Sequence, residues 1–260
     1  MLFIDDLNRK IEVPTPPQKV ISLCPSITET LIELDINVIG RTKFCIHPKE
    51  KIQQIQIVGG TKSVHYDRIH HLKPDLIICE KEENTPEIVE TLEKQYPVYV
   101  VNVESWKDGL KMMTNFGKIF QQEKKIDEWL KLLPESPPTI VQKKRVAYLI
   151  WKEPLMTVGK TTYINDVLNS LGFINPFENR PERYPQISFE ELQSAELDFL
   201  FLSSEPFPFK DKHIQEFKQN LPDVHIQIVD GEMFSWYGVR MIRAIDYFQN
   251  KLKEMLRFFI

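Results

Sequence analysis

The chain has 260 residues, enough for two compact units with separate cores or for one large unit. With 42% hydrophobic residues, 27% charged residues and a formal net charge of −4, the composition is globular and gives no general reason to expect nucleic acid or an anionic membrane as a partner. No stretch approaches the ~20 apolar residues that a spanning helix needs, so the sequence predicts no membrane span. Three cysteines, none in a CxxC pair, indicate reduced or buried thiols.

The first ten residues determine what the sequence predicts about compartment. Charges begin at Asp5, and there is no apolar core followed by a small-residue cleavage site, as a secretory signal peptide would have. As written, the sequence predicts a cytoplasmic protein. The alternative is a periplasmic or lipid-anchored protein whose start is misassigned or whose leader was removed.

In chain order, short apolar runs alternate with helical segments in both halves of the sequence. Continuous apolar strands are typical of a parallel sheet whose two faces are covered by helices. The strands expected in the first half are Val20–Leu23, Val38–Gly40, Leu76–Cys79 and Val98–Val101. Those expected in the second half are Arg145–Ile150, Asp198–Leu202 and His225–Val229.

Between the two halves, apolar residues recur at three- and four-residue steps from Trp106 to Leu133, the spacing of one helical face. Pro134 ends the run, so the pattern predicts one helix over residues 105–133, roughly 40 Å long. Such a helix fits a spine between two α/β units. An ordinary crossover helix inside one large domain fits the pattern equally well.

The polar and aromatic residues that follow the strands are the candidate binding residues, because ligands of parallel sheets sit at the carboxyl ends of the strands. In the first half they are Pro25, Ser26, Phe44, Thr61, Glu80, Glu82, Glu83 and Asn84. In the second half they are Trp151, Arg183, Tyr184, Ser204, Glu205, Phe207, Trp236 and Tyr237. If a spine helix sets two sheets side by side, these loops face one cleft.

The aromatic candidates have two interpretations. Trp236 and Tyr237 lie between a strand and the last helix, where their rings could stack on a planar macrocycle or pack between two lobes. Trp151 has the same two interpretations, and Phe207 is either a pocket wall or part of a core.

The charged candidates are also open to two interpretations. The acidic loop Glu80–Asn84 is either a solvated loop or a polar cap that hydrogen-bonds a ligand's amides or a hydrated metal, with Glu205 as its counterpart in the second half. Arg183 with Tyr184 could bind an anionic chelate.

His47, in a loop before a proline, is the candidate metal ligand. Axial coordination of a metal already held by a macrocycle needs only one residue. A structural, hydrogen-bonded histidine is the alternative.

Catalytic motifs are absent from the sequence. It contains no G-x-S-x-G elbow and no H-E-x-x-H pair, and the triplet at Gly159 lacks the glycine five residues earlier that a phosphate loop requires, since Pro154 stands there. The sequence therefore predicts a protein that is not an enzyme and has no intrinsic cofactor.

Three motifs resemble those of the helical-backbone (class III) substrate-binding proteins of metal-chelate ABC importers. The matching segments are Lys19–Ser26, then Val58–Lys62 with Leu72–Leu76, and Gly159–Thr161 with Tyr184–Ser188. The resemblance covers nearly the whole chain in the right order and is closest to the cobalamin-binding and iron-siderophore-binding group. The chain departs from that group in lacking a leader and an aromatic residue near Thr61.

This resemblance implies two Rossmann-like α/β lobes with mainly parallel sheets, bridged by one long backbone helix. The implied domains are residues 1–104, a helix and linker over 105–138, and residues 139–260. The implied function is non-enzymatic binding of a metal chelate (cobalamin or another corrinoid, haem, or a ferric siderophore) in the interlobe cleft by a monomer that works with an ABC importer permease. A cytosolic chelate-handling enzyme or a sensor on the same fold is the alternative.

Overall fold

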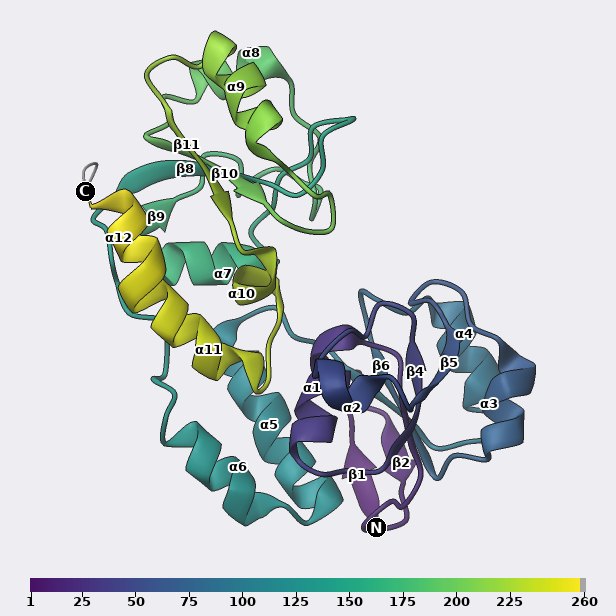
Figure 1. The fold of residues 1–260 in the computed structure, drawn as a ribbon. Coiled ribbons are helices and arrows are strands. Elements are labelled where there is room, and N and C mark those ends of the chain that lie inside the picture. The colour runs from purple at the N-terminus through teal and green to yellow at the C-terminus, as the bar shows by residue number, and fades with distance from the viewer. Residues whose placement is uncertain (258–260) are drawn as a thin grey trace. The chain divides into compact units, whose positions relative to one another are not determined.

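The computed structural model describes residues 1–257, which form two compact α/β units (Figure 1). Unit 1 comprises Met1–Val103, Asp108–Leu132 and Trp236–Arg240, and unit 2 takes the other described residues. Each unit contains a parallel sheet with helices, so the predicted fold class of two α/β lobes with mainly parallel sheets is confirmed.

Unit 1 is built on a five-stranded sheet in the order β5-β4-β3-β6-β7, and every neighbouring pair is parallel. Its strands are β3 (Val20–Ser22), β4 (Val38–Thr42), β5 (Gln56–Gly59), β6 (Leu76–Glu80) and β7 (Val98–Val101). The chain moves outward from β3 in one direction and from β6 in the other. The topological switch point, where parallel sheets bind ligands, therefore lies between β3 and β6.

Helices cover both faces of this sheet, which explains why its strands are apolar throughout. The helices that follow the strands are α1 (Pro25–Glu33), α2 (Lys49–Ile52), α3 (Tyr66–Leu72) and α4 (Pro86–Leu92). Alternate strand residues such as Ile21, Ile77 and Val98 form one core with α3 and α4, which lie together beside the sheet in Figure 1. Val20 and Ile78 on the other face are also fully buried.

The first residues form a separate two-stranded hairpin of β1 (Leu2–Ile4) and β2 (Lys10–Glu12), which are antiparallel. Asp5 organises the turn, because its carboxylate accepts the backbone N–H of Arg9 and pairs with the Arg9 guanidinium at 2.7 Å.

The segment predicted as one helix over residues 105–133 forms two helices instead, α5 (Trp106–Phe120) and α6 (Glu123–Leu130). Gln121 adopts a left-handed φ of 55°, and the N–H of Gln122 donates to the carbonyl of Gly117 at 2.8 Å, as in a Schellman helix end. Gly117 also lets the start of α6 approach closely, since a Cβ there would lie 3.3 Å from the Cα of Glu123. The apolar spacing continues across the break because both helices bury a face, so periodicity alone conceals the turn.

Unit 2 contains a four-stranded sheet in the order β11-β10-β8-β9, again with all pairs parallel. Its strands are β8 (Lys144–Leu149), β9 (Phe173–Ile174), β10 (Phe199–Ser203) and β11 (His225–Val229). The chain moves from β8 to β9 on one side and from β10 to β11 on the other. The switch point of this sheet therefore lies between β8 and β10.

Two aromatic-rich cores hold the helices of unit 2 against its sheet. These helices are α7 (Tyr163–Ser170), α8 (Phe189–Ser194), α9 (Asp211–Asn220), α10 (Gly231–Ser235), α11 (Arg240–Asp246), the π-helix η1 (Tyr247–Leu252) and α12 (Lys253–Leu256). One face of the sheet packs with α8 and α9 through Leu192 and Phe217. On the other face Phe234 lies 5.2 Å from Tyr148 and 5.1 Å from Phe248, between ring centroids.

No helix within the described residues is both long enough and apolar enough to cross a membrane.

Candidate functional site

Asn84 joins the strand ends at the switch point of unit 1. Its side-chain amide donates to the carbonyls of Leu23, after β3, at 3.2 Å and Thr61, after β5, at 2.9 Å. Its amide oxygen accepts the N–H of Glu80, the last residue of β6, at 2.8 Å. Asn84 is buried, so these bonds are shielded from water and fix three strand ends relative to one another.

Glu80 is a buried carboxyl at the same point, with 2% of its surface exposed. One of its oxygens accepts the N–H groups of Glu82 at 2.7 Å and Glu83 at 2.8 Å. Burial raises the pKa of Glu80 to about 7, and these two bonds oppose the shift. Its protonation therefore changes near neutral pH, which allows the group to donate or accept a hydrogen bond.

Thr61 and Glu83 complete the polar side of this point. Burial raises the pKa of Glu83, although the Thr61 hydroxyl bonds to its carboxylate and Lys62 lies nearby. The chain reaches Thr61 through Gly59, whose φ of 138° is left-handed and whose absent Cβ would lie 2.5 Å from the carbonyl oxygen of Ser63. Glycine is required there for the turn that brings Thr61 to Glu83 and Asn84.

Pro25 and Ser26 open α1 immediately after β3. Pro25 stands at the first helical position, where its missing N–H leaves no bond unmade. Ser26 is buried, and its hydroxyl lies 3.4 Å from the thiol of Cys24. Both residues therefore lie beside the switch point, although Ser26 is buried, and their contact with a ligand stays a prediction.

The loop after β4 carries Phe44 and His47. Phe44 has 51% of its surface exposed, and the ammonium of Lys43 lies 5.0 Å from its ring centroid. His47 is half-buried, and its ring meets Trp236 edge-on with centroids 5.5 Å apart. No group of three or more His, Cys, Asp or Glu side chains that could hold a metal ion occurs in residues 1–257. Metal ligation by His47 stays a prediction.

Trp236 and Tyr237 are buried, each with 7% of its surface exposed. The guanidinium of Arg240 lies 5.1 Å from the Trp236 ring, which already contacts His47. The Tyr237 hydroxyl lies 3.7 Å from the Cys24 thiol. Burial raises the pKa of Tyr237 well above the ordinary value. Stacking of these rings on a ligand therefore requires that they become exposed, and it also stays a prediction.

In unit 2 the most exposed aromatic residue at a strand end is Trp151, directly after β8. Its exposed fraction is 40%, and its ring meets Phe207 at a centroid distance of 5.7 Å. Phe207 in turn packs on Phe209, with ring centroids 4.7 Å apart. The structure thus brings Trp151 and Phe207 together, with the indole open to solvent.

The remaining candidates of unit 2 are engaged in local contacts. The Ser204 hydroxyl accepts the N–H of Gly231 at 2.9 Å, and Glu205 accepts the Ser235 hydroxyl at 3.0 Å. The Arg183 guanidinium pairs with Glu104 at 2.9 Å. Tyr184, next to it, is half-buried. Because Arg183 already has a carboxylate partner, it is a weaker candidate for binding an anionic chelate than the sequence indicated.

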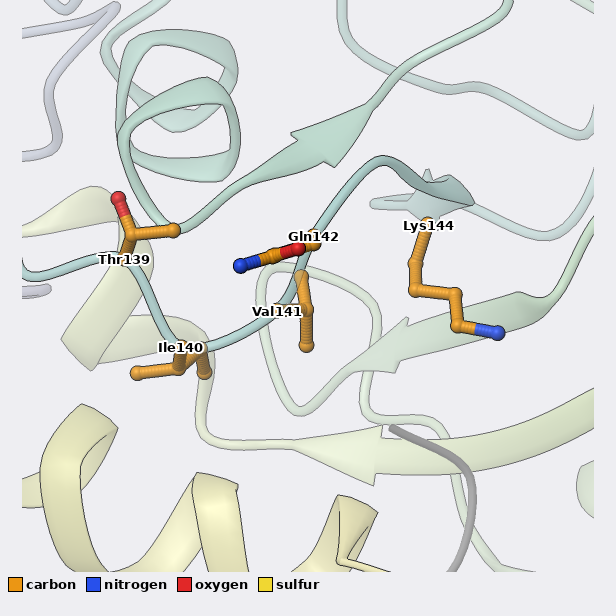
Figure 2. A pocket seen from close by; sticks show the side chains of 5 residues that line it. All are labelled: Thr139, Ile140, Val141, Gln142 and Lys144. Carbon is orange, nitrogen blue, oxygen red and sulfur yellow. The ribbon is translucent and has the colours of Figure 1, made fainter.

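A hollow in unit 2 lies away from these strand ends. Its volume is about 460 Å³, and it is lined by Thr139, Ile140, Val141, Gln142 and Lys144 (Figure 2). These residues precede and begin β8, so the hollow is at the amino end of the strand. None of the predicted site residues lines it.

Two features near the site were not predicted from sequence. Arg41 is a buried cation within β4. Glu29 of α1 forms a buried, two-pronged ion pair with Arg240, at 2.7 and 2.8 Å. A charged residue inside the apolar run Val38–Thr42 is a signal that would have found Arg41; the sequence separation of Glu29 and Arg240 conceals their pairing.

Comparison with known proteins decides which family this arrangement represents. A family model described as periplasmic binding protein matches residues 20–225, well over half of the chain. The chain belongs to the periplasmic binding protein family.

Relatives in this family match the chain over most of its length. The vitamin B12-binding protein of Salmonella typhi is 26% identical over 246 residues, 91% of each chain. The uncharacterized ABC transporter substrate-binding lipoprotein YvrC of Bacillus subtilis is 28% identical over 183 residues, 64% of this chain and 58% of its own.

Solved structures show the same fold. The periplasmic vitamin B12-binding protein BtuF of Vibrio cholerae gives a TM-score of 0.73 at 16% identity, covering 93% of this chain and 99% of its own. The periplasmic haem-binding protein BhuT, in complex with two haems, gives a TM-score of 0.76 at 16% identity, covering 92% and 98%.

Family membership settles two of the predictions from sequence. The relatives are named as binding proteins and not as enzymes, which confirms that this periplasmic binding protein is not an enzyme. The predicted cytoplasmic location is wrong, because the family and its relatives are periplasmic proteins or lipoproteins. The prediction rested on the first ten residues. Export signals are removed from mature proteins, so the residues at the start of a sequence are weak evidence for its compartment.

Proposed function

We propose that this periplasmic binding protein captures a metal chelate, with a corrinoid such as cobalamin as the first candidate and haem or a ferric siderophore as the others. The chelate is its transported ligand and not a cofactor. Delivery to the permease of an ABC importer is the proposed use, supported by the relative named as an ABC transporter substrate-binding lipoprotein.

The observation that carries this proposal is the exposure of aromatic side chains at strand ends. Phe44 after β4 and Trp151 after β8 have 51% and 40% of their surfaces exposed. Large exposed aromatic residues at the ligand-binding edge of a parallel sheet provide flat apolar surface for a macrocycle, as in many small-molecule sites. Each unit supplies one such residue.

The polar groups at the switch point of unit 1 suit a ligand that carries amides. Glu80 and Thr61 are buried near the switch point of unit 1, where Asn84 fixes the strand ends. A carboxyl that titrates near neutral pH and a hydroxyl can exchange hydrogen bonds with neutral amide groups. The periphery of a corrin ring carries such amides.

The cations of unit 2 give less support to an anionic chelate. Arg183 pairs with Glu104, and the ammonium of Lys152 pairs with Glu216 at 2.9 Å. Binding a carboxylate-rich or catecholate ligand through these groups would require it to displace a protein carboxylate. This ranks a corrinoid ahead of a ferric siderophore, and the vitamin B12-binding relatives point the same way.

Tryptophan fluorescence titration with cyanocobalamin, haemin and a panel of ferric siderophores tests the proposal. We expect one chelate class to quench the emission with a dissociation constant at or below the micromolar range, and Trp151→Ala to remove part of the quenching. Trp129 of α6 is the matched control, because it lies against Lys125 and not at a strand end. Absence of binding by every chelate would contradict the proposal.

A further inference from the structure

The loop after β4 presents apolar side chains to solvent on a backbone that internal hydrogen bonds hold in place. Phe44 and Ile46 have 51% and 48% of their surfaces exposed, whereas Cys45 between them is buried. The Cys45 thiol lies 3.1 Å from the Thr28 hydroxyl and 3.2 Å from that of Thr42. The loop thus alternates outward and inward side chains although it is neither strand nor helix.

Arg41 holds this loop from inside. Its guanidinium donates to the carbonyl of Ile52 at 3.0 Å, to that of Thr42 at 3.1 Å and to that of Cys45 at 3.0 Å. These acceptors lie at the start, the middle and the far end of the segment from Thr42 to Ile52. One planar group therefore ties three points of the loop together.

The charge of Arg41 is buried beside backbone carbonyls and not beside a carboxylate of the described residues. The side chain is 8% exposed, and no carboxylate within residues 1–257 forms an ion pair with it. Burying an unpaired cation is costly, and within the described part of the chain its hydrogen-bond acceptors are these three backbone carbonyls. A rigid fork that donates in several fixed directions is specific to arginine, since lysine has a single ammonium.

We propose that Arg41 is a positioning residue, which clamps the segment 42–52, from the end of β4 through α2, so that Phe44 and Ile46 are held out for the ligand. Holding the loop in one conformation removes an ordering cost from binding. The ligand part of this inference rests on the proposed function, whereas the clamp itself is a property of the free protein.

Hydrogen exchange measured by mass spectrometry tests the clamp without a ligand. In Arg41→Met we expect the amides of peptides covering residues 42–52 to exchange roughly tenfold faster or more, while other unit 1 peptides keep their rates. Arg41→Lys, which keeps the charge but not the fork, should show the same local pattern and serves if Arg41→Met does not fold. Arg145→Met is the matched control, because Arg145 of β8 donates to the Ala195 carbonyl at 2.8 Å in unit 2.

Affinity for cyanocobalamin and haemin, measured in a double-mutant cycle with Phe44→Ala, tests the positioning role. We expect Arg41→Lys to weaken binding several-fold in the wild-type background and to have little further effect once Phe44 is removed, because Arg41 acts through the loop.

Faster exchange spread evenly over unit 1, or additive losses of affinity in the cycle, would overturn the proposal by making Arg41 a general stabiliser. If neither probe binds the wild-type protein, the proposed function fails for these ligands, and the exchange rates still decide whether Arg41 clamps the loop.

Discussion

Unit 1 and unit 2 carry the same kind of parallel sheet, but the two units are stabilised by different interactions. In unit 1, buried polar groups predominate: Asn84 joins three strand ends, and Glu29 pairs with Arg240 out of contact with water. In unit 2, aromatic packing around Phe207 supports the exposed Trp151, and its ion pairs lie nearer the surface.

This difference indicates how each unit should respond to substitution. Buried hydrogen-bonded groups fix geometry and are intolerant of substitution, because an unpaired polar group in a dry site is costly. Aromatic packing is less directional and tolerates small shifts. We therefore expect substitutions of the buried polar groups of unit 1 to change stability and pH response, and substitutions of the exposed aromatic residues of either unit to change mainly ligand contact.

The largest expected effect is loss of the buried ion pair in unit 1. Glu29→Gln should lower the free energy of unfolding by about 3–5 kcal/mol, because it leaves the buried Arg240 without its carboxylate. Glu216→Gln, which breaks the more exposed pair with Lys152, should cost about 1 kcal/mol or less. Urea denaturation measures both values, and equal losses would remove the distinction between the units.

The second effect is the pH dependence that Glu80 brings to unit 1. Its pKa is about 7 in the folded protein and about 4.5 as a free side chain, so the unfolded chain loses this proton first. Stability falls as pH rises from about 4.5 to 7, and the loss amounts to roughly 3 kcal/mol above that range. Glu80→Gln should remove this slope in urea denaturation at several pH values. A variant with an unchanged slope would refute the assignment.

A smaller loss of stability is expected from replacing a buried asparagine, and each unit contains one that can be compared. Asn84→Ala should cost about 2 kcal/mol, because it leaves the Leu23 and Thr61 carbonyls and the Glu80 N–H unpaired. Asn175 of unit 2 is the matched site, since its amide donates to the Val158 carbonyl at 2.8 Å.

Peptide-resolved hydrogen exchange distinguishes the two asparagine variants. Asn84→Ala should accelerate exchange around β3, β5 and β6, and Asn175→Ala should do so only in unit 2. Acceleration in both units from either substitution would show that the units do not respond independently.

The smallest effect on stability is expected from the exposed aromatic residues. Phe44→Ala and Trp151→Ala should each change the free energy of unfolding by about 1 kcal/mol or less, because 51% and 40% of their surfaces are exposed to water. Each should nevertheless weaken chelate binding by roughly tenfold, the loss expected for an aromatic contact in a site. A large loss of stability with unchanged affinity would show that these rings are structural.

The sequence was sufficient for the parts of this protein that depend on local pattern. Apolar runs such as Leu76–Cys79 predicted the strands, and the polar residues after them, Glu80 to Asn84, lie at the switch point. The break at Gln121 was missed because both helices keep the same apolar spacing. The place of Trp236 in a loop left ligand stacking and packing as two interpretations, and its contact with the distant His47 is a tertiary property that the sequence does not show.

Equilibrium dialysis of the wild-type protein against cyanocobalamin, haemin and a ferric siderophore tests the central claim most directly, since it does not depend on any tryptophan lying near the ligand. We predict saturable binding of one chelate class, with cyanocobalamin the strongest, and about tenfold weaker binding by Phe44→Ala and by Trp151→Ala. Failure of all three chelates to bind, or binding that neither substitution weakens, would contradict the account.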